Sequence, residues 1–480
     1  MEPKSEKLSW WVKIGYGVGD IFGGGSEVLI GFYYLIFLTD VVRIPPALAG
    51  TVILVSKIFD SIIDPFAGII SDRTRTRIGR RRPYLLIGIP LVFLSFFALF
   101  YPFSMPSQTS RLWAVMASYV FFSTILSFVT LNYTALHAEI TLDYNERSSL
   151  SSFRIFFSTV ASIIAALVPL QIVSAFPDVH TGYIAMGLFF GIFFALPFIA
   201  TIIAVKERPE FQKPPEPFNW RKAFIDPFKN RTFAYTLAMY LFAFVAIDTL
   251  STIVVYFIKY YMLRSSEVSF VNGTLLVAQV ISLPFYVWLS KRTSKVRGYI
   301  LGLGIWVVAM LFSFLLGPNL ATFWVYAFAV VVGLGTGGIV VMIYAIFPDI
   351  PDVDELKSGE RREGIYSALI SFTRKVSSAL GIFAVSYAIG WAGYIPPMQQ
   401  TINGVTKLIE QPQSDTFLLV LRLIFMFLPI VLLSCALIFA ARFPLTPDLH
   451  HRLNILLAKQ RKNEPVDETE KAELTKVLLG

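Results

Sequence analysis

Long apolar stretches, separated by short polar segments, occupy most of the chain between residues 12 and 441. A helix needs about 20 mostly apolar residues to cross the hydrocarbon core of a bilayer. Twelve segments approach this length: 12–39, 47–71, 84–103, 112–141, 151–175, 182–205, 233–262, 267–290, 298–317, 321–346, 364–394 and 416–441. The pattern therefore predicts an all-α integral membrane protein with twelve transmembrane helices.

Lysine and arginine are concentrated in alternate connections between these segments. The connection 72–83 carries six arginines, and 206–232 and 290–298 are also basic, whereas the intervening connections are poor in both residues. Because basic loops remain on the cytoplasmic side, these three connections and both termini are predicted to be cytoplasmic. The expected location is the plasma (inner) membrane.

Two equivalent helix ends indicate an internal repeat. Pro65 is followed six residues later by Ser-Asp-Arg-Thr, and Pro284 is followed six residues later by Ser-Lys-Arg-Thr, at an offset of 219 residues. Parallel repeats of this kind are a known plan of transporters. We predict four parts: a six-helix half that contains the acids discussed below (1–205), a cytoplasmic linker (206–232), a second six-helix half (233–444) and a cytoplasmic tail (445–480).

Composition narrows the class of protein. Charged residues make up 15% of the chain, against about 25% in soluble proteins. The net charge of +9 lies mainly in the short loops, so it is interpreted as membrane topology and not as nucleic-acid binding. A phosphate-binding loop and a hydrolase motif are missing, and four histidines and one cysteine predict no thiolate or histidine metal cluster. The chain is predicted to be neither an enzyme nor ATP-driven, and to need no cofactor beyond a coupling ion.

Asp60 and Asp64 are the sharpest candidates for function. Their spacing of four places both carboxylates on one helix face. Two like charges in a low dielectric require a proton, a basic partner or a bound cation, and Na⁺ prefers such oxygen ligands. The corresponding positions of the repeat are Gln279 and Leu283. The predicted role is cation binding, with a structural ion pair as the alternative.

Other ionisable residues lie in the predicted spans, and each is a functional candidate at that depth. Asp20 is interpreted as a gate-closing contact. Glu27 and Asp248 are either ligand contacts or structural hydrogen-bonding groups. Lys375 is either a structural counter-charge or a competitor of the bound cation.

Three further segments carry charge or amphipathic character. Residues 143–154 are expected to form a polar loop, and the acidic segment 349–363 is expected to be a mostly solvated loop. In the tail, Leu449, Leu453 and Leu456 predict a short amphipathic helix that is solubilising rather than regulatory.

Four strings carry a resemblance to a known family: KIGYGVGD, SKIFDSIIDPFAGIISDRTRTRIGRRRPY, ITLDYNERSSLSSFR and DVDELKSGERREGIYSALISFTRKVSSALG. Over nearly its whole length the chain resembles the glycoside-pentoside-hexuronide:cation symporters, the melibiose-permease group of the major facilitator superfamily. The resemblance implies the major facilitator fold, with two pseudo-symmetric six-helix halves.

The resemblance also implies roles for individual residues. Asp60 and Asp64 match the family's cation-binding acids, and Ser127 stands where melibiose permease has a threonine hydroxyl of that site. Lys375 matches a lysine close to the cation site. Arg154 aligns, after a one-residue gap, with an arginine near the sugar.

This sequence departs from the family where melibiose permease grips its sugar. The two sugar-binding aspartates correspond to Gly24 and Thr130, and a tryptophan one turn later corresponds to Thr134. Ile63 stands where the family has an asparagine implicated in Na⁺ use, which makes proton coupling more plausible. A melibiose-like substrate is doubtful, and animal lysophospholipid carriers share the retained acids without the sugar pair.

The predicted function is Na⁺- or H⁺-coupled symport of a small solute by alternating access, with a sugar or glycoside as the default. The alternatives are a cation-coupled carrier of an amphipathic lipid and a non-transporting sensor. A monomer in the lipid bilayer is expected. Predicted solute contacts are Glu27, Thr130, Tyr133, Thr134 and Arg154. Predicted gating or interdomain residues are Asp20, Asp72, Arg73, Asp143, Arg147 and Arg361.

Overall fold

The computed structural model describes residues 7–141, 143–207, 226–358, 363–402, 405–461 and 464–479. These residues are mostly helical and fall into two compact units. The first comprises Met1–Glu216, Ser251–Gly273 and Ile382–Leu421. The second comprises Pro217–Leu250, Thr274–Gly381 and Arg422–Gly480. Arg361 lies outside the described residues.

Eleven helices in the described part of the chain are long and apolar enough to cross a membrane, and each coincides with one of the predicted segments. The first predicted segment, 12–39, is different. It is divided into α1 (Trp10–Gly17) and α2 (Asp20–Leu29), and two π-helical stretches follow, η1 (Ile30–Tyr34) and η2 (Phe37–Val41). Glycine explains the close packing at this division, because a Cβ on Gly17 would lie 3.0 Å from the Phe153 backbone.

The other helices of the first 207 residues follow the apolar segments. They are α3 (Pro46–Arg73), α4 (Arg82–Leu99), α5 (Gln108–Ile140), α6 (Tyr144–Leu167), α7 (Pro169–Ser174), α8 (Val179–Ala195) and α9 (Pro197–Ala204). Pro169 and Pro197 interrupt two of the predicted crossings, because proline cannot donate the backbone bond that continues a helix. The predicted polar loop 143–154 is wrong. Residues from Tyr144 onward belong to α6, where Asp143 Oδ1 accepts a bond from the Glu146 N–H at 3.1 Å.

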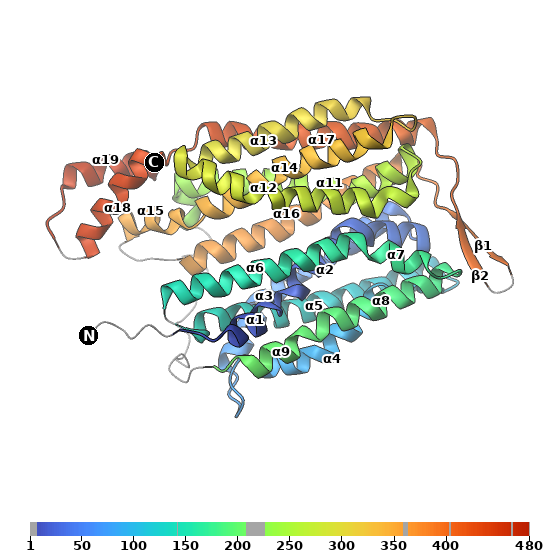
Figure 1. Ribbon diagram of the computed structural model, residues 1–480, viewed down its shortest axis with the longest axis horizontal. Coiled ribbons are helices and arrows are strands. Elements are labelled where there is room, and N and C mark those ends of the chain that lie inside the picture. The colour runs from blue at the N-terminus through green and yellow to red at the C-terminus, as the bar shows by residue number, and fades with distance from the viewer. Residues whose placement is uncertain are drawn as a thin grey trace. The chain divides into compact units, whose positions relative to one another are not determined.

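The later helices begin with α11 (Arg231–Tyr256), which continues as the π-helical η5 (Phe257–Tyr261). They continue with α12 (Val268–Arg292), α13 (Lys295–Phe312), α14 (Thr322–Ile346), α15 (Asp349–Ser358), α16 (Glu363–Trp391) and α17 (Asp415–Ala441). Between α16 and α17 the chain forms an antiparallel hairpin of β1 (Met398–Ile402) and β2 (Val405–Ile409), which the sequence analysis did not predict. Figure 1 shows this hairpin beyond the ends of α7 and α8.

The tail folds into α18 (Pro447–Arg461) and α19 (Glu468–Leu478). The predicted amphipathic tail helix is confirmed as α18, whose Leu453 and Leu456 enter a buried cluster that also contains Val353 of α15. The predicted solvated loop at 349–363 is therefore wrong for residues 349–358, because the apolar face of α15 is covered by tail leucines. Figure 1 shows α15, α18 and α19 gathered beyond one end of α13 and α14. Arg461 adds an ion pair to Glu355 of α15 at 2.5 Å.

Candidate functional site

Asp60 is a buried carboxylate on α3. Its side chain is 2% exposed, and Oδ1 accepts a hydrogen bond from the hydroxyl of Ser127 on α5. Asp64 lies one turn further along the same helix and is half-buried. The structure thus places together the two acids and the hydroxyl that the sequence analysis assigned to the cation site. Their role in binding a cation stays a prediction.

Pro65 lies in the same turn of α3 as the two acids. A proline inside a helix has no N–H to donate to the carbonyl four residues earlier, and here that carbonyl belongs to Ser61. The missing helical bond leaves a backbone oxygen beside the acids without its usual donor. Local sequence therefore increases the density of oxygen ligands at this turn, which suits a hard cation.

A polar stripe extends along α5 at spacings of four residues. Tyr119, Ser123 and Ser127 are all at most 3% exposed, and this spacing places them on one helix face. Ser56 of α3, one turn before Asp60, faces these residues. Its hydroxyl contacts the sulfur of Met116 at 3.8 Å. Sequence reasoning missed Tyr119 and Ser123, although their spacing within an apolar helix was a usable signal.

A second charged cluster joins α2 and α6. Arg154 Nε lies 3.1 Å from Asp20 Oδ1, and its guanidinium lies over the ring of Tyr133 at 5.6 Å. Tyr133 stacks on Tyr16 with ring centroids 4.8 Å apart and donates its hydroxyl to the Tyr16 carbonyl at 2.7 Å. From the sequence, Asp20 and Arg154 have separate predicted roles, gating for Asp20 and solute contact for Arg154. The structure makes them one ion pair.

The remaining predicted solute contacts lie in different surroundings. Thr130 and Thr134 donate their hydroxyls to carbonyls of their own helix, Leu126 O at 2.6 Å and Thr130 O at 2.7 Å. The side chain of Glu27 is exposed. Nothing in this arrangement assigns a solute to these residues, so their role stays a prediction.

Gly24 of α2, which corresponds to a sugar-binding aspartate of melibiose permease, is closely packed in this chain. A Cβ on Gly24 would collide with the Ser158 hydroxyl and lie 2.9 Å from the Ser158 carbonyl oxygen. A carboxylate could not enter this position without displacing α6. The space that a side chain at this position would need is thus filled by Ser158.

The basic loop between α3 and α4 is tied together by acids. Asp72 pairs with Arg81 at 2.5 Å and with Arg80 at 3.8 Å, and Arg80 also pairs with Glu139 of α5 at 2.6 Å. Arg73, predicted to act beside Asp72, is exposed. The partners of Asp72 are therefore the arginines eight and nine residues later in the chain.

Glu207, just after α9, closes the same loop from another direction. Its carboxylate accepts three consecutive backbone N–H groups, from Arg80, Arg81 and Arg82, at 2.5, 2.7 and 2.8 Å. Arg82 begins α4, and the unpaired amides of a helix start attract an anion. The sequence analysis did not predict this contact.

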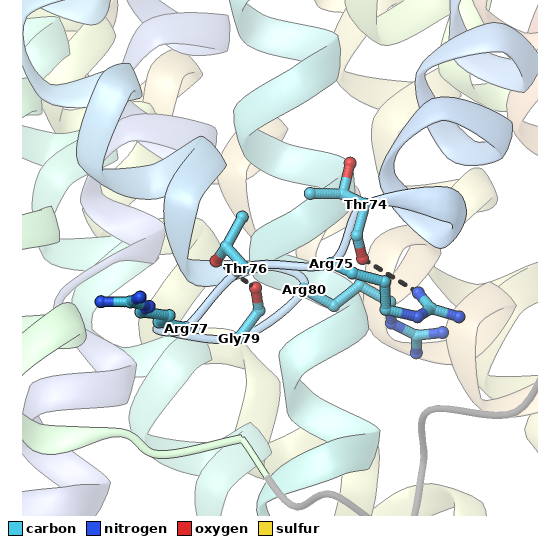
Figure 2. A pocket seen from close by; sticks show the side chains of 6 residues that line it. All are labelled: Thr74, Arg75, Thr76, Arg77, Gly79 and Arg80. Carbon is cyan, nitrogen blue, oxygen red and sulfur yellow. Dashed lines mark hydrogen bonds between the residues drawn. The ribbon is translucent and has the colours of Figure 1, made fainter.

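A cavity of about 420 Å³ is lined entirely by this loop, from Thr74 to Arg80. Figure 2 shows Arg77 pointing away from Arg75 and Arg80, with Arg75 bonded to the carbonyl of Thr74. The lining is a single turn that is exposed from Arg75 to Arg77, and Thr76 already donates its hydroxyl to the Gly79 carbonyl at 2.6 Å. This cavity is therefore not taken as the solute site.

The predicted charges of the later helices lie in the second unit. Asp248 of α11 pairs with Arg374 of α16 at 2.6 Å, a contact that was not predicted. Lys375 is half-buried, and its predicted influence on Asp60 and Asp64 remains a prediction.

Arg147, a predicted gating residue of the first unit, donates Nε–H to the Thr141 carbonyl at 2.8 Å, next to the start of α6.

Within the described ranges, no group of three or more histidine, cysteine, aspartate or glutamate side chains could hold a metal ion. A site for a transition metal or Ca²⁺ normally uses such a group. Asp60, Asp64 and Ser127 form a smaller set of oxygen ligands.

Comparisons with known proteins agree with this architecture. The chain is 32% identical to an uncharacterized symporter, YjmB, of Bacillus subtilis, over 83% of this chain and 87% of that protein. It is 26% identical to the isoprimeverose transporter of Lactiplantibacillus pentosus, over 84% of each chain. It is 23% identical to the sodium-dependent lysophosphatidylcholine symporter 1-B of Danio rerio, over 99% of this chain and 94% of that protein.

Solved structures show the same fold. A bacterial homologue of the iron transporter ferroportin in an inward-facing state matches with a TM-score of 0.62 at 14% identity, covering 90% of this chain and 98% of that one. The sequence model of the family described as MFS/sugar transport protein matches residues 15–447. The predicted major facilitator fold is thereby confirmed, and the chain belongs to the MFS/sugar transport protein family of multi-pass membrane transporters.

Proposed function

We propose that this transporter is a cation-coupled symporter in which Asp60 and Asp64 bind Na⁺ or H⁺. One observation carries the proposal: Asp60 is 2% exposed within a membrane helix, one turn from a second acid and bonded by the Ser127 hydroxyl. A charge at such depth costs about 2.5–3.5 kcal/mol. A bound cation offsets that cost, because it neutralises the carboxylate and is held by oxygens.

Coupling follows if the charged, empty site disfavours the conformational change that exposes the site to the other side of the membrane. A cation removes this penalty, and a solute adds contacts that favour the same loaded state. The two ligands then increase each other's affinity by the same factor, as linkage requires. The chain is proposed to act in the plasma (inner) membrane, as a monomer with both termini cytoplasmic.

A sugar or glycoside is the proposed solute, supported by relatives such as the isoprimeverose transporter. The closed space beside Gly24 supports a solute bound differently from melibiose. A lysophospholipid is the second candidate, because a relative that matches 99% of this chain is a lysophosphatidylcholine symporter.

Uptake into proteoliposomes tests this proposal, with a panel of sugars, glycosides and lysophospholipids and with Na⁺ and H⁺ gradients imposed separately. We expect one gradient to drive accumulation of one solute class, and Asp60→Asn and Asp64→Asn to abolish that drive. Ser95→Ala is a matched control for Ser127→Ala, because Ser95 is similarly buried and, among the residues that the structure describes, donates to the Val92 carbonyl of its own helix at 3.2 Å. Gradient-driven uptake that survives in both acid variants would show the mechanism to be wrong.

A further inference from the structure

Two helix ends far apart in the sequence have the same unusual form. The π-helical turn η2 is followed by Arg43 with a φ of 63°, and η5 is followed by Leu263 with a φ of 55°. In both, the first residue of the turn accepts a bond from the N–H five residues later, Val42 to Phe37 at 3.1 Å and Met262 to Phe257 at 3.0 Å. Left-handed backbone at a residue other than glycine is strained and often marks functional sites, as π-turns do.

The two helix ends meet at the carboxylate of Asp40. This side chain is 2% exposed, and its Oδ2 accepts bonds from Lys259 Nζ and from the Tyr260 hydroxyl, each at 2.6 Å. Its Oδ1 accepts the hydroxyl of Thr39 at 2.8 Å and also that of Tyr394. Four donors from three separate parts of the chain therefore converge on one buried acid.

The donors are connected to one another as well. The Tyr260 and Tyr394 hydroxyls lie 2.9 Å apart, and the Thr39 and Tyr256 hydroxyls lie 2.7 Å apart. The ammonium of Lys259 lies 5.0 Å from the centroid of the Tyr260 ring. A carboxylate satisfied in this way holds its partners firmly, and losing any one donor leaves a buried charge incompletely bonded.

Close backbone packing continues the contact beside this cluster. A Cβ on Gly50 of α3 would lie 2.6 Å from Ser386 Cβ of α16, and one on Gly390 would lie 3.4 Å from the Ala47 N. Glycine at these two positions permits α16 to lie directly against the start of α3. Ser386 is completely buried there and donates its hydroxyl to the Ile382 carbonyl of its own helix.

The hairpin adds two polar contacts on the same side. Gln399 Nε2 donates to the Val41 carbonyl, and Asp178, at the start of α8, accepts the Thr406 N–H, both at 2.8 Å. Burial would raise the pKa of Asp178, but the bonds from Thr181 and Thr406 lower it to about 2. The carboxylate is therefore charged at neutral pH and holds the hairpin by a charge-assisted bond.

We propose that Asp40, Lys259, Tyr260 and Tyr394 form the outer gate of the transporter, which is closed in this structure. With basic loops cytoplasmic, the end of the first crossing that carries Asp40 faces outward. The donors come from the ends of α11 and α16, which belong to the predicted second six-helix half but pack within the first compact unit, so opening the outer path requires these donors to leave Asp40. The inference concerns access and does not depend on which cation or solute is carried.

Labelling of a single cysteine tests the gate. The parent is Cys435→Ser with Ser386→Cys, and the reagent is a membrane-impermeant maleimide added outside cells that contain the full-length chain, without solute. We expect the parent to be protected and Asp40→Asn to label at least about tenfold faster, because one lost charge-assisted bond shifts a two-state equilibrium by roughly that factor. Lys259→Gln should act in the same direction, and the double variant should add little to either.

Glu267→Gln is the matched control, since it removes an acid of the same region that pairs with Arg264, three residues away, at 3.4 Å. It should leave labelling at the parental rate. Equal rates in the parent and in Asp40→Asn, or equal acceleration by Glu267→Gln, would overturn the gate. If Asp40→Asn fails to reach the membrane, Tyr394→Phe decides the matter, because it removes one donor and keeps the ring. Accelerated labelling in that variant supports the gate, and parental labelling refutes it.

Discussion

Replacing Asp60 by asparagine should separate a cation site from a structural ion pair. The buried charge costs about 2.5–3.5 kcal/mol, and a charge-assisted bond such as that from Ser127 returns about 1.5–3 kcal/mol. If a bound cation and not a basic side chain neutralises Asp60, these two contributions nearly cancel, and the cation-free Asp60→Asn protein should be as stable as the natural protein or up to about 2 kcal/mol more stable. Breaking a buried structural pair instead costs about 3–5 kcal/mol.

The stabilisation by added cation, in contrast, should be lost in Asp60→Asn. A ligand present at 100 times its dissociation constant stabilises the folded state by about 2.7 kcal/mol. The natural protein should gain this amount from the coupling cation, and Asp60→Asn should gain nothing. Thermal unfolding of the purified transporter, with and without Na⁺ and at two pH values, measures both effects when every variant is heated at one rate.

A surface acid supplies the control for this experiment. Glu473 is exposed and pairs with Arg452 at 2.9 Å, so Glu473→Gln should keep the full cation response. The reasoning would be refuted if Asp60→Asn lost several kcal/mol of stability in cation-free buffer. It would also be refuted if this variant still responded to the cation as the natural protein does.

Three further predictions test other parts of the structure. Ser127→Ala should weaken cation binding by about tenfold or more, through one lost charge-assisted contact, while Ser95→Ala leaves the cation-dependence of uptake unchanged. Leu453→Ala should cost about 2–5 kcal/mol by opening a cavity in the tail cluster, seen as an earlier unfolding transition without a change in cation affinity. The bond from the Thr406 N–H to Asp178 should persist above about pH 4 and weaken as the pH falls toward about 2, because it stabilises the charged carboxylate, whose pKa is lowered to about 2. A spin label at Gln400 should then become more mobile at low pH, and a mobility independent of pH would contradict this bond.

The transmembrane helices could be predicted because the bilayer imposes one requirement on every crossing. Apolar length alone located the eleven spanning helices. It did not predict that the first segment, 12–39, is divided between Gly17 and Asp20. The expectation of a solvated loop was wrong for α15. Residues 349–358 are rich in charge, and their apolar side packs against the tail leucines, a contact that the local sequence does not indicate.

Part of the candidate site was also visible in the sequence. Asp60 and Asp64 lie on one helix, so their relation follows from spacing. The contact with Ser127, 67 residues away, came from the resemblance. Asp40 was missed because it lies at the end of a predicted crossing, where an acid costs little. Its partner Tyr394 is 354 residues distant, and no local pattern connects them.

Solute-driven cation entry is the most direct test of the proposed symport through Asp60 and Asp64. Proteoliposomes without any ion gradient would receive an inward gradient of the transported solute, and entry of radioactive Na⁺ or of protons would be followed. The natural protein should move the coupling cation inward with the solute, and Asp60→Asn should not. Solute entry without cation entry in the natural protein, or unchanged cation entry in Asp60→Asn, would contradict the account.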